Sequence, residues 1–221
     1  MAKLGLTPQK PLQRAYQRDP EAIEKWQCET YPAIARQAKA QGAEVFFWDE
    51  SGFRADTVHG KTWAVRGQTP VVHRPGQRQS ISAASAVNAN GAFWFCTYEG
   101  ALNAEGFVEL LQKMMRYRKK PVHLVLDSLP AHKKALVRDY VSSTKGKLTL
   151  HFLPGYAPDL NPDELVWSHV KRTGTEQGAH CRRARNCVSV SRSNSQNFRN
   201  CLASSVHFFK PRLSLIFATA E

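Results

Sequence analysis

The chain has 221 residues, of which 31 are Lys or Arg and 18 are Asp or Glu, giving a formal net charge of +13. This length suits one large domain or two small ones, with a core that needs no disulfide or metal to fold. The sequence contains no long apolar run and no secretory signal, which argues against a membrane-spanning or secreted product. Five unevenly spaced cysteines fit a reducing cytosol. The excess positive charge indicates a polyanionic partner.

The charge differs along the chain. Residues 1–48, 49–172 and 173–221 have net charges of +2 (7 minus 5), +6 (17 minus 11) and +5 (7 minus 2). The middle segment holds 11 of the 18 acidic residues although it is net basic. Carboxylates add nothing to a nucleic-acid-binding surface unless a metal ion lies between them and the phosphates. This pattern indicates that some of the carboxylates serve another purpose, such as binding a metal.

The first predicted element is a helix over residues 20–41, which contains Pro32 and stops at Gly42. Its candidate buried residues are Trp26, Ala33, Ile34 and Ala38. The apolar run at 44–48 follows and predicts a buried strand that ends directly before Asp49.

The next part of the chain favours strands. Two strand-like pieces lie at 63–66 and 70–73 within a Gly-rich stretch. Two longer strands are predicted at 80–87 and 92–98. The sequence Asn-Ala-Asn-Gly at 88–91 connects them, which is typical of a hairpin.

Helices and strands then alternate. The remaining predicted elements are a helix at 103–118, a strand at 121–126, a helix at 131–143, a strand at 148–153 and a helix that begins at Pro162. Asn103 and Asn161 are the predicted N-caps of the first and last of these helices. The order of strands and helices predicts an α/β domain with a mixed sheet flanked by helices.

Three carboxylates stand at comparable places in this pattern. Asp49 and Asp127 each directly follow an apolar strand, and Glu164 opens a helix after a third strand. Functional groups of α/β domains lie at one end of the sheet, where three carboxylates would repel one another unless a cation joined them. Hard oxygen ligands suit Mg²⁺ or Mn²⁺. Two such ions would activate a water or a 3′-hydroxyl for phosphoryl transfer.

Each of these carboxylates also has an ordinary structural interpretation. Asp49 could be a solvated acid at a strand end, and Asp127 could belong to a simple turn. Asn161 and Glu164 have the spacing of a capping box, so local chemistry alone favours Glu164 as a cap over Glu164 as a ligand. Asp159 and Asp163 are competing candidates for the third ligand.

Four segments resemble the catalytic domain of bacterial insertion-sequence transposases of the Tc/mariner superfamily. They are FFWDESGF (46–53), GKTWAVRGQTP (60–70), HLVLDSLPAH (123–132) and LHFLPGYAPDLNPDELVWSHVK (150–171). The resemblance implies an RNase H-like fold and an Asp-Asp-Glu triad that binds two Mg²⁺ or Mn²⁺ ions. By motif, the triad falls on Asp49, Asp127 and Glu164.

Other motif positions follow from the same resemblance. Ser128 stands where many members have Asn, and we expect the short hydroxyl to be a workable replacement. His132 matches a family position that can order the site or contact DNA, although it could equally be an ordinary helix-start histidine. Trp167 is expected to pack behind the triad. Lys171 and Arg172 are candidate DNA-phosphate contacts, as are Arg116, Arg118, Lys119 and Lys120.

The resemblance implies recognition of terminal inverted repeats, DNA cleavage at the element's ends and strand transfer into target DNA, by a homo-oligomer on paired ends in the bacterial cytoplasm. Residues 1–42 are interpreted as a linker and helical segment left from a missing helix-turn-helix region, and 43–172 as the catalytic domain. Residues 173–221 hold 3 of the 5 Cys and 7 Ser in 49 residues and show no periodicity. This composition predicts an atypical tail that is disordered or poorly packed. Our hypothesis is that a frameshift near Gly174 produced it. An inactive remnant with residual DNA binding and another RNase H-like nuclease are the alternatives.

Overall fold

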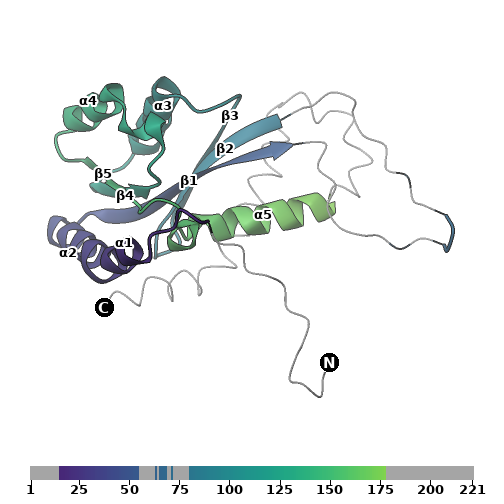
Figure 1. Ribbon diagram of the computed structural model, residues 1–221. Coiled ribbons are helices and arrows are strands. Elements are labelled where there is room, and N and C mark those ends of the chain that lie inside the picture. Colours follow the sequence, from purple (N-terminus) through teal and green to yellow (C-terminus); the bar gives the residue numbers. More distant parts are fainter. Residues whose placement is uncertain (1–14, 55–62, 64, 69–70, 72–79, 178–221) are drawn as a thin grey trace, which may run out of the picture.

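A five-stranded mixed sheet lies at the centre of the computed structural model (Figure 1). The structure describes residues 15–54, 63, 65–68, 71 and 80–177. The strands are β1 (Glu44–Arg54), β2 (Ser80–Val87), β3 (Phe93–Tyr98), β4 (Val122–Leu126) and β5 (Leu148–Phe152), in the spatial order β3-β2-β1-β4-β5. β1 pairs antiparallel with β2 and parallel with β4. The predicted α/β class with a mixed sheet is therefore confirmed.

The β2–β3 hairpin forms where the sequence predicted it. Asn88 accepts a 2.7 Å hydrogen bond from the Ala92 backbone N–H through its side-chain oxygen. Gly91 has φ of 76°, a conformation that glycine adopts without strain. This turn sets the antiparallel register in which Ala86 lies opposite Trp94.

The N-terminal helical segment has three parts. They are α1 (Pro20–Lys25), the π-helical turn Trp26–Thr30 and α2 (Tyr31–Gln41), which ends at Gly42 with φ of 62°. Trp26, Ile34 and Ala38 are buried as predicted. The prediction for Ala33 was wrong, because its position is rotated away from the sheet and its side chain is exposed.

The later helices also follow the predicted order. They are α3 (Ala104–Met115), a 3₁₀ turn (Pro130–Lys133), α4 (Ala135–Ser143), a 3₁₀ turn (Pro158–Leu160) and α5 (Asp163–Gln177). Asn103 caps α3 by accepting a 2.8 Å bond from the Gly106 N–H. The single helix expected at 131–143 is divided because Lys134 is extended, with ψ of 153°.

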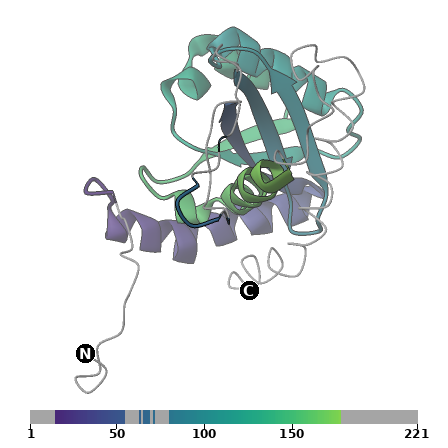
Figure 2. The same ribbon diagram turned by 90° about the vertical axis from the view of Figure 1, so that its right-hand side faces the viewer.

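Two helical layers enclose the sheet (Figures 1 and 2). α3 and α4 cover one face, where a core cluster includes Phe46, Trp48 and Phe107. α1, α2 and α5 cover the other face, where Phe47 and Val125 point toward α1 and α2. Alternate residues of β1 therefore face opposite layers, as the pleat of a strand requires.

Several predicted boundaries differ from those in the structure, and α3 ends at Met115, before the predicted end at 118. β1 continues past the predicted end at residue 48, because pairing with β2 extends it to Arg54. Trp63, Arg66 and Val71 are described but lie in no strand, contrary to the strand-like pieces predicted there. α5 continues to Gln177, past the predicted domain end at 172. The rest of the predicted tail, from 178 onward, lies outside the described residues.

Within the part of the chain that the structure describes, no helix is both long and apolar enough to cross a membrane.

Candidate active site

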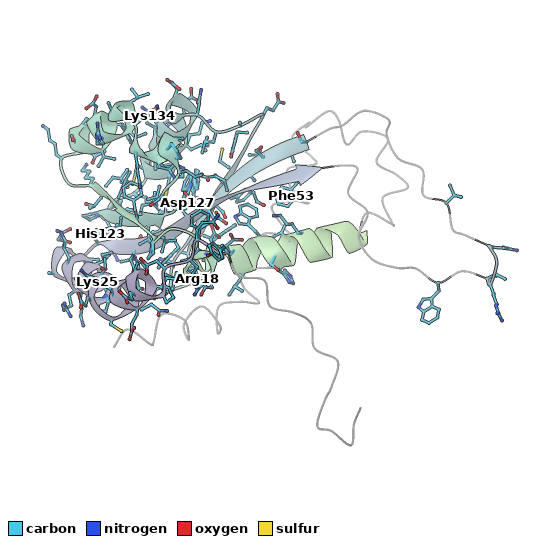
Figure 3. The ribbon with its side chains drawn as sticks, in the orientation of Figure 1. Arg18, Lys25, Phe53, His123, Asp127 and Lys134 are labelled. Carbon is cyan, nitrogen blue, oxygen red and sulfur yellow. The ribbon has the colours of Figure 1, made fainter. Side chains whose placement is uncertain are left out.

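Asp49 lies on β1, and Asp127 directly follows the neighbouring strand β4. β1 and β4 are parallel and in register up to the pair Phe47 and Val125. Asp49 and Asp127 each lie two residues beyond this last pair, so both follow the paired region of the two strands at the same end. Figure 3 shows Asp127 near the centre of the molecule, between the two helical layers.

Asp49 lies among several acidic groups. Burial, together with the negative charges of Glu164, Asp163 and Glu50, raises the pKa of Asp49 to about 9. Glu164 therefore lies within the electrostatic environment of Asp49. Asp127 is not among the groups that raise this pKa.

The start of α5 positions Glu164. Asn161 donates a 3.0 Å hydrogen bond from its side-chain amide to the Trp48 carbonyl, which ties this loop to β1. Its side-chain oxygen accepts from the Asp163 N–H at 3.1 Å, so Asn161 is the predicted cap of α5. The capping box predicted as an alternative is not formed, because the Asn161 backbone N–H donates to the Pro158 carbonyl instead of to Glu164. The exposed Glu164 is therefore available to another partner.

The two competing candidates for the third ligand have different surroundings. Asp159 forms a salt bridge with Arg18, with an Nη2 to Oδ2 distance of 2.8 Å. Asp163 is 0 % exposed and accepts a 2.6 Å hydrogen bond from the Ser85 hydroxyl, while its Oδ1 has no hydrogen-bond partner. Burial raises the pKa of Asp163 well above its usual range, and Glu164 and Glu50 raise it further. Asp163 belongs to the acidic cluster but has no access to solvent.

Asp127 is hydrogen bonded to the loop that follows it. Its Oδ1 accepts from the Leu129 N–H at 3.2 Å and lies 3.0 Å from Nδ1 of His132. The other ring nitrogen of His132, Nε2, is 3.1 Å from Oε1 of Glu50. The sequence analysis missed Glu50, although its place next to Asp49 was a usable signal.

His132 lies inside the protein. Its side chain is 1 % exposed, and its ring packs against Phe107 with 4.3 Å between the ring centroids. Burial lowers the pKa of His132, but hydrogen bonds to Asp127 and Glu50 outweigh this effect and raise it to about 9. So little exposed surface leaves His132 poorly placed for the direct DNA contact that the sequence suggested.

The remaining predicted site residues have assorted roles. The Ser128 hydroxyl donates to the Leu153 carbonyl at 3.2 Å, which connects the loop after β4 to the end of β5. Trp167 is 1 % exposed and packs on Phe53, so its predicted packing role is confirmed. Lys171 is exposed on α5, and the side chain of Arg172 lies outside the described residues.

The acidic cluster suits a divalent cation by the type of its side chains and not by their arrangement. Within the described residues, no three His, Cys, Asp or Glu side chains are arranged so that they could hold a metal ion. The acidic cluster is nevertheless rich in carboxylate oxygens, which Mg²⁺ and Mn²⁺ prefer. Burial is the main cause of the raised pKa of Asp49, and the negative charges of Glu164, Asp163 and Glu50 add to it. A cation among them would offset the repulsion between these charges.

Family models match two parts of the chain. The model described as DDE superfamily endonuclease matches residues 44–185, which is more than half of the chain. The model described as winged helix-turn helix matches residues 1–30. No curated protein matches the chain significantly.

Solved structures with a similar fold include those of the Mos1 mariner transposase. The Mos1 mariner paired end complex with Mn has a TM-score of 0.65 at 17% identity, with 99% of this chain and 68% of that chain covered. The corresponding complex with Mg has a TM-score of 0.64 at 16% identity, covering 100% and 68%. The catalytic domain of Mos1 mariner transposase has a TM-score of 0.53 at 15% identity, covering 95% and 98%. The strand order and flanking helices match the RNase H-like fold of these structures.

Proposed function

Because the chain belongs to the family of DDE superfamily endonucleases and has the fold of a mariner transposase, we propose that it cuts DNA strands at the ends of an insertion element and joins them to target DNA. This proposal follows the function predicted from the sequence. The observation that supports it most directly is the 3.0 Å hydrogen bond from the Asn161 side chain to the Trp48 carbonyl, which joins the start of α5, where Glu164 lies, to β1 next to Asp49.

We assign metal binding to Asp49, Asp127 and Glu164, with two Mg²⁺ or Mn²⁺ ions as the metals. Bound ions would activate the attacking oxygen and stabilise the leaving oxygen. The Mos1 complexes with Mn and with Mg support divalent metals in proteins of this fold. The chain contributes one carboxylate from each of β1, the loop after β4 and α5. Because Asp163 is fully buried, it supports the start of α5 and does not replace Glu164.

We propose that the DNA partners are terminal inverted repeats and target DNA. The winged helix-turn-helix match at residues 1–30 supports a DNA-reading function for the N-terminal segment. We also propose that copies of the chain assemble on paired ends, by analogy with the paired end complex of Mos1. The protein would then work in the bacterial cytoplasm, on nucleoid DNA.

The basic residues differ in their availability to phosphates. Arg118 lies 3.3 Å from Glu44 and stacks over Phe46, so it is engaged within the protein. Lys119 is exposed, and Lys171 is exposed on α5. We assign phosphate contacts to exposed lysines of this kind, together with Arg172.

The hypothesis of a frameshift concerns the tail after the catalytic domain. The family match extends to residue 185, which is eleven residues past Gly174 (185 minus 174). This extent argues against a frameshift as early as Gly174. Translation of the other reading frames beyond this point tests the hypothesis, because a true frameshift predicts that one of them continues with an amphipathic helix.

The catalytic proposal is tested by cleavage of DNA that contains the inverted repeats flanking the gene, with Mg²⁺ or Mn²⁺. Asp49→Ala, Asp127→Ala and Glu164→Ala should each abolish nicking, whereas Asp139→Ala, which removes an exposed acid on α4, should retain most of it. Nicking that persists in all three triad variants would refute the assignment. Loss only in Asp163→Ala would show that the neighbouring residue is the ligand.

The same assay separates the alternatives. An inactive remnant would bind the repeats without cutting them. A different RNase H-like nuclease would cut DNA without preference for the repeats and without strand transfer.

A further inference from the structure

We propose that Glu50 and His132 form a positioning pair that fixes the orientation of the Asp127 carboxylate. The inference rests on the proposed function, because Asp127 is one of its metal ligands. Glu50 lies on β1 and His132 on the 3₁₀ turn after β4, 82 residues apart in sequence, yet Nε2 of His132 is 3.1 Å from Oε1 of Glu50. Nδ1 of the same ring is 3.0 Å from Oδ1 of Asp127. The imidazole therefore bridges two carboxylates.

The ring has little freedom to move. His132 is 1 % exposed, and the Phe107 ring packs against it at 4.3 Å between centroids. A buried ring in a packed environment keeps one rotamer. Its two nitrogens thus point in fixed directions, one toward each carboxylate.

Glu50 is itself held in place. Its Oε1 accepts a second hydrogen bond, from Nε1 of Trp48, at 2.5 Å. Trp48 is in turn buried and stacks on Trp94. Trp48 and Glu50 share the α3 side of β1, whereas Asp49 between them faces the opposite layer. Glu50 is therefore placed to act on His132 and not as a further ligand beside Asp49.

The consequence for Asp127 is that one carboxylate oxygen is occupied and the other is left open. Oδ1 accepts from the Leu129 N–H and lies 3.0 Å from Nδ1 of His132, whose ring nitrogen is also 3.4 Å from the Asp127 backbone carbonyl, so both the side chain and the backbone of Asp127 face the ring. In the described part of the chain, Oδ2 has no hydrogen-bond partner. Outer hydrogen bonds of this kind orient metal-ligating carboxylates, and their loss typically costs about 10- to 100-fold in metal affinity or activity.

The test compares variants that remove the bridge with variants that keep it. Glu50→Ala removes the acceptor, and His132→Phe keeps a ring against Phe107 but removes both N–H donors. Glu50→Gln retains an acceptor oxygen and should rescue most of the loss. Glu44→Ala is the matched control, because Glu44 is an acid at the other end of the same strand and pairs with Arg118.

Mn²⁺ binding by calorimetry and nicking of repeat DNA are measured for each folded variant. We expect Glu50→Ala and His132→Phe each to weaken Mn²⁺ binding about 10- to 100-fold. The double variant should bind Mn²⁺ no more weakly than the single variant with the lower affinity, because both changes act through one bridge. Parent-like Mn²⁺ affinity and nicking in folded Glu50→Ala would overturn the proposal. Additive losses in the double variant would overturn it as well.

A metal-free measurement separates this proposal from the proposed function. The ¹⁵N resonances of the His132 ring should shift in Asp127→Asn and in Glu50→Ala, but not in Glu44→Ala. Unchanged ring resonances would overturn the bridge even if the parent cuts DNA. If these variants show the shifts but the parent neither binds Mn²⁺ nor cuts DNA, the bridge exists and the proposed function is refuted. The role of this bridge in metal binding is then refuted as well.

Discussion

Arg18 and Asp159 connect the N-terminal segment to the loop that precedes α5. The guanidinium of Arg18 pairs with both carboxylate oxygens of Asp159, with 2.8 Å between Nη2 and Oδ2. Asp159 lies five residues before Glu164 (164 minus 159). Arg18 also lies within the winged helix-turn-helix match, so this pair links the candidate DNA-reading segment to the loop that positions a candidate catalytic residue.

The first prediction concerns this pair. Because the pair lies at the protein surface, Arg18→Ala should lower the melting temperature only slightly, and high salt should remove the difference. Although the fold is kept, the rate of nicking of repeat DNA should fall, because the loop before Glu164 loses its connection to the N-terminal segment. The exchanged pair Arg18→Asp with Asp159→Arg should restore nicking. Failure of the exchange, or equal loss in the surface control Arg36→Ala, would contradict the prediction.

The second prediction concerns metal and stability. Mn²⁺ at about 100 times its dissociation constant should stabilise the folded parent by about 2.7 kcal/mol, if it binds only the folded state. For a domain of this size, this corresponds to several degrees in melting temperature. The shift should be absent in Asp49→Ala and Glu164→Ala, and EDTA should reverse it in the parent. An equal shift in Asp49→Ala would place the metal elsewhere.

The third prediction concerns acid stability. Nδ1 of His123 lies 2.9 Å from Nε2 of His151, and Nε2 of His123 lies 2.9 Å from the Gln41 side-chain oxygen, on the α2 side of the sheet (Figure 3). Burial lowers the pKa of His123, and burial together with the His123 charge lowers the pKa of His151 to about 4. Both rings are therefore neutral in the folded protein at neutral pH.

The direction of the pH effect follows from these pKa values. The unfolded chain takes up protons near pH 6.5, whereas folded His151 does so only near pH 4, so stability falls as the pH falls between these values. The loss attributable to His151 is at most about 3 kcal/mol. In His151→Gln, the melting temperature should decrease less between pH 7 and pH 5 than it does in the parent. The same decrease in both proteins would show that this pair does not titrate as described.

The fourth prediction separates two basic residues that are adjacent in sequence. Arg118 is largely buried over Phe46, so Arg118→Ala should destabilise the fold by about 1 to 2 kcal/mol through lost packing and cation–π contact. Lys119→Ala should leave the melting temperature unchanged. If Lys119 contacts a phosphate, its removal should weaken binding to all DNA sequences and reduce the salt dependence by about one charge. The opposite pattern would reverse the roles of the two residues.

Much of the fold was predictable because it depends on local patterns. The apolar runs before Asp49 and Asp127 predicted two strands that proved to be neighbours in the sheet. The Asn-Ala-Asn-Gly turn at 88–91 predicted a hairpin, and Asn161 predicted the start of α5. Strand propensity, turn chemistry and caps act over a few residues, so one chain segment contains the information needed.

The extent of β1 and the state of Glu164 depended on distant segments. β1 extends beyond its apolar residues because the residues up to Arg54 pair with β2. Glu164 and Asn161 have capping-box spacing, yet Asn161 donates its backbone N–H to Pro158, so the local pattern alone favoured the wrong partner. A hydrogen-bond donor has one best acceptor, and the path of the loop decides which acceptor is close enough.

The bridge from Glu50 through His132 to Asp127 shows most clearly which features follow from the local sequence and which depend on distant segments. The residue types and the strand-end position of Asp127 follow from the sequence. That Glu50, rather than solvent, occupies the second nitrogen of His132 follows only from the parallel packing of β4 beside β1 and from the burial of the ring under Phe107. Contacts between residues 82 positions apart depend on the relative placement of whole strands, which the tertiary structure alone decides.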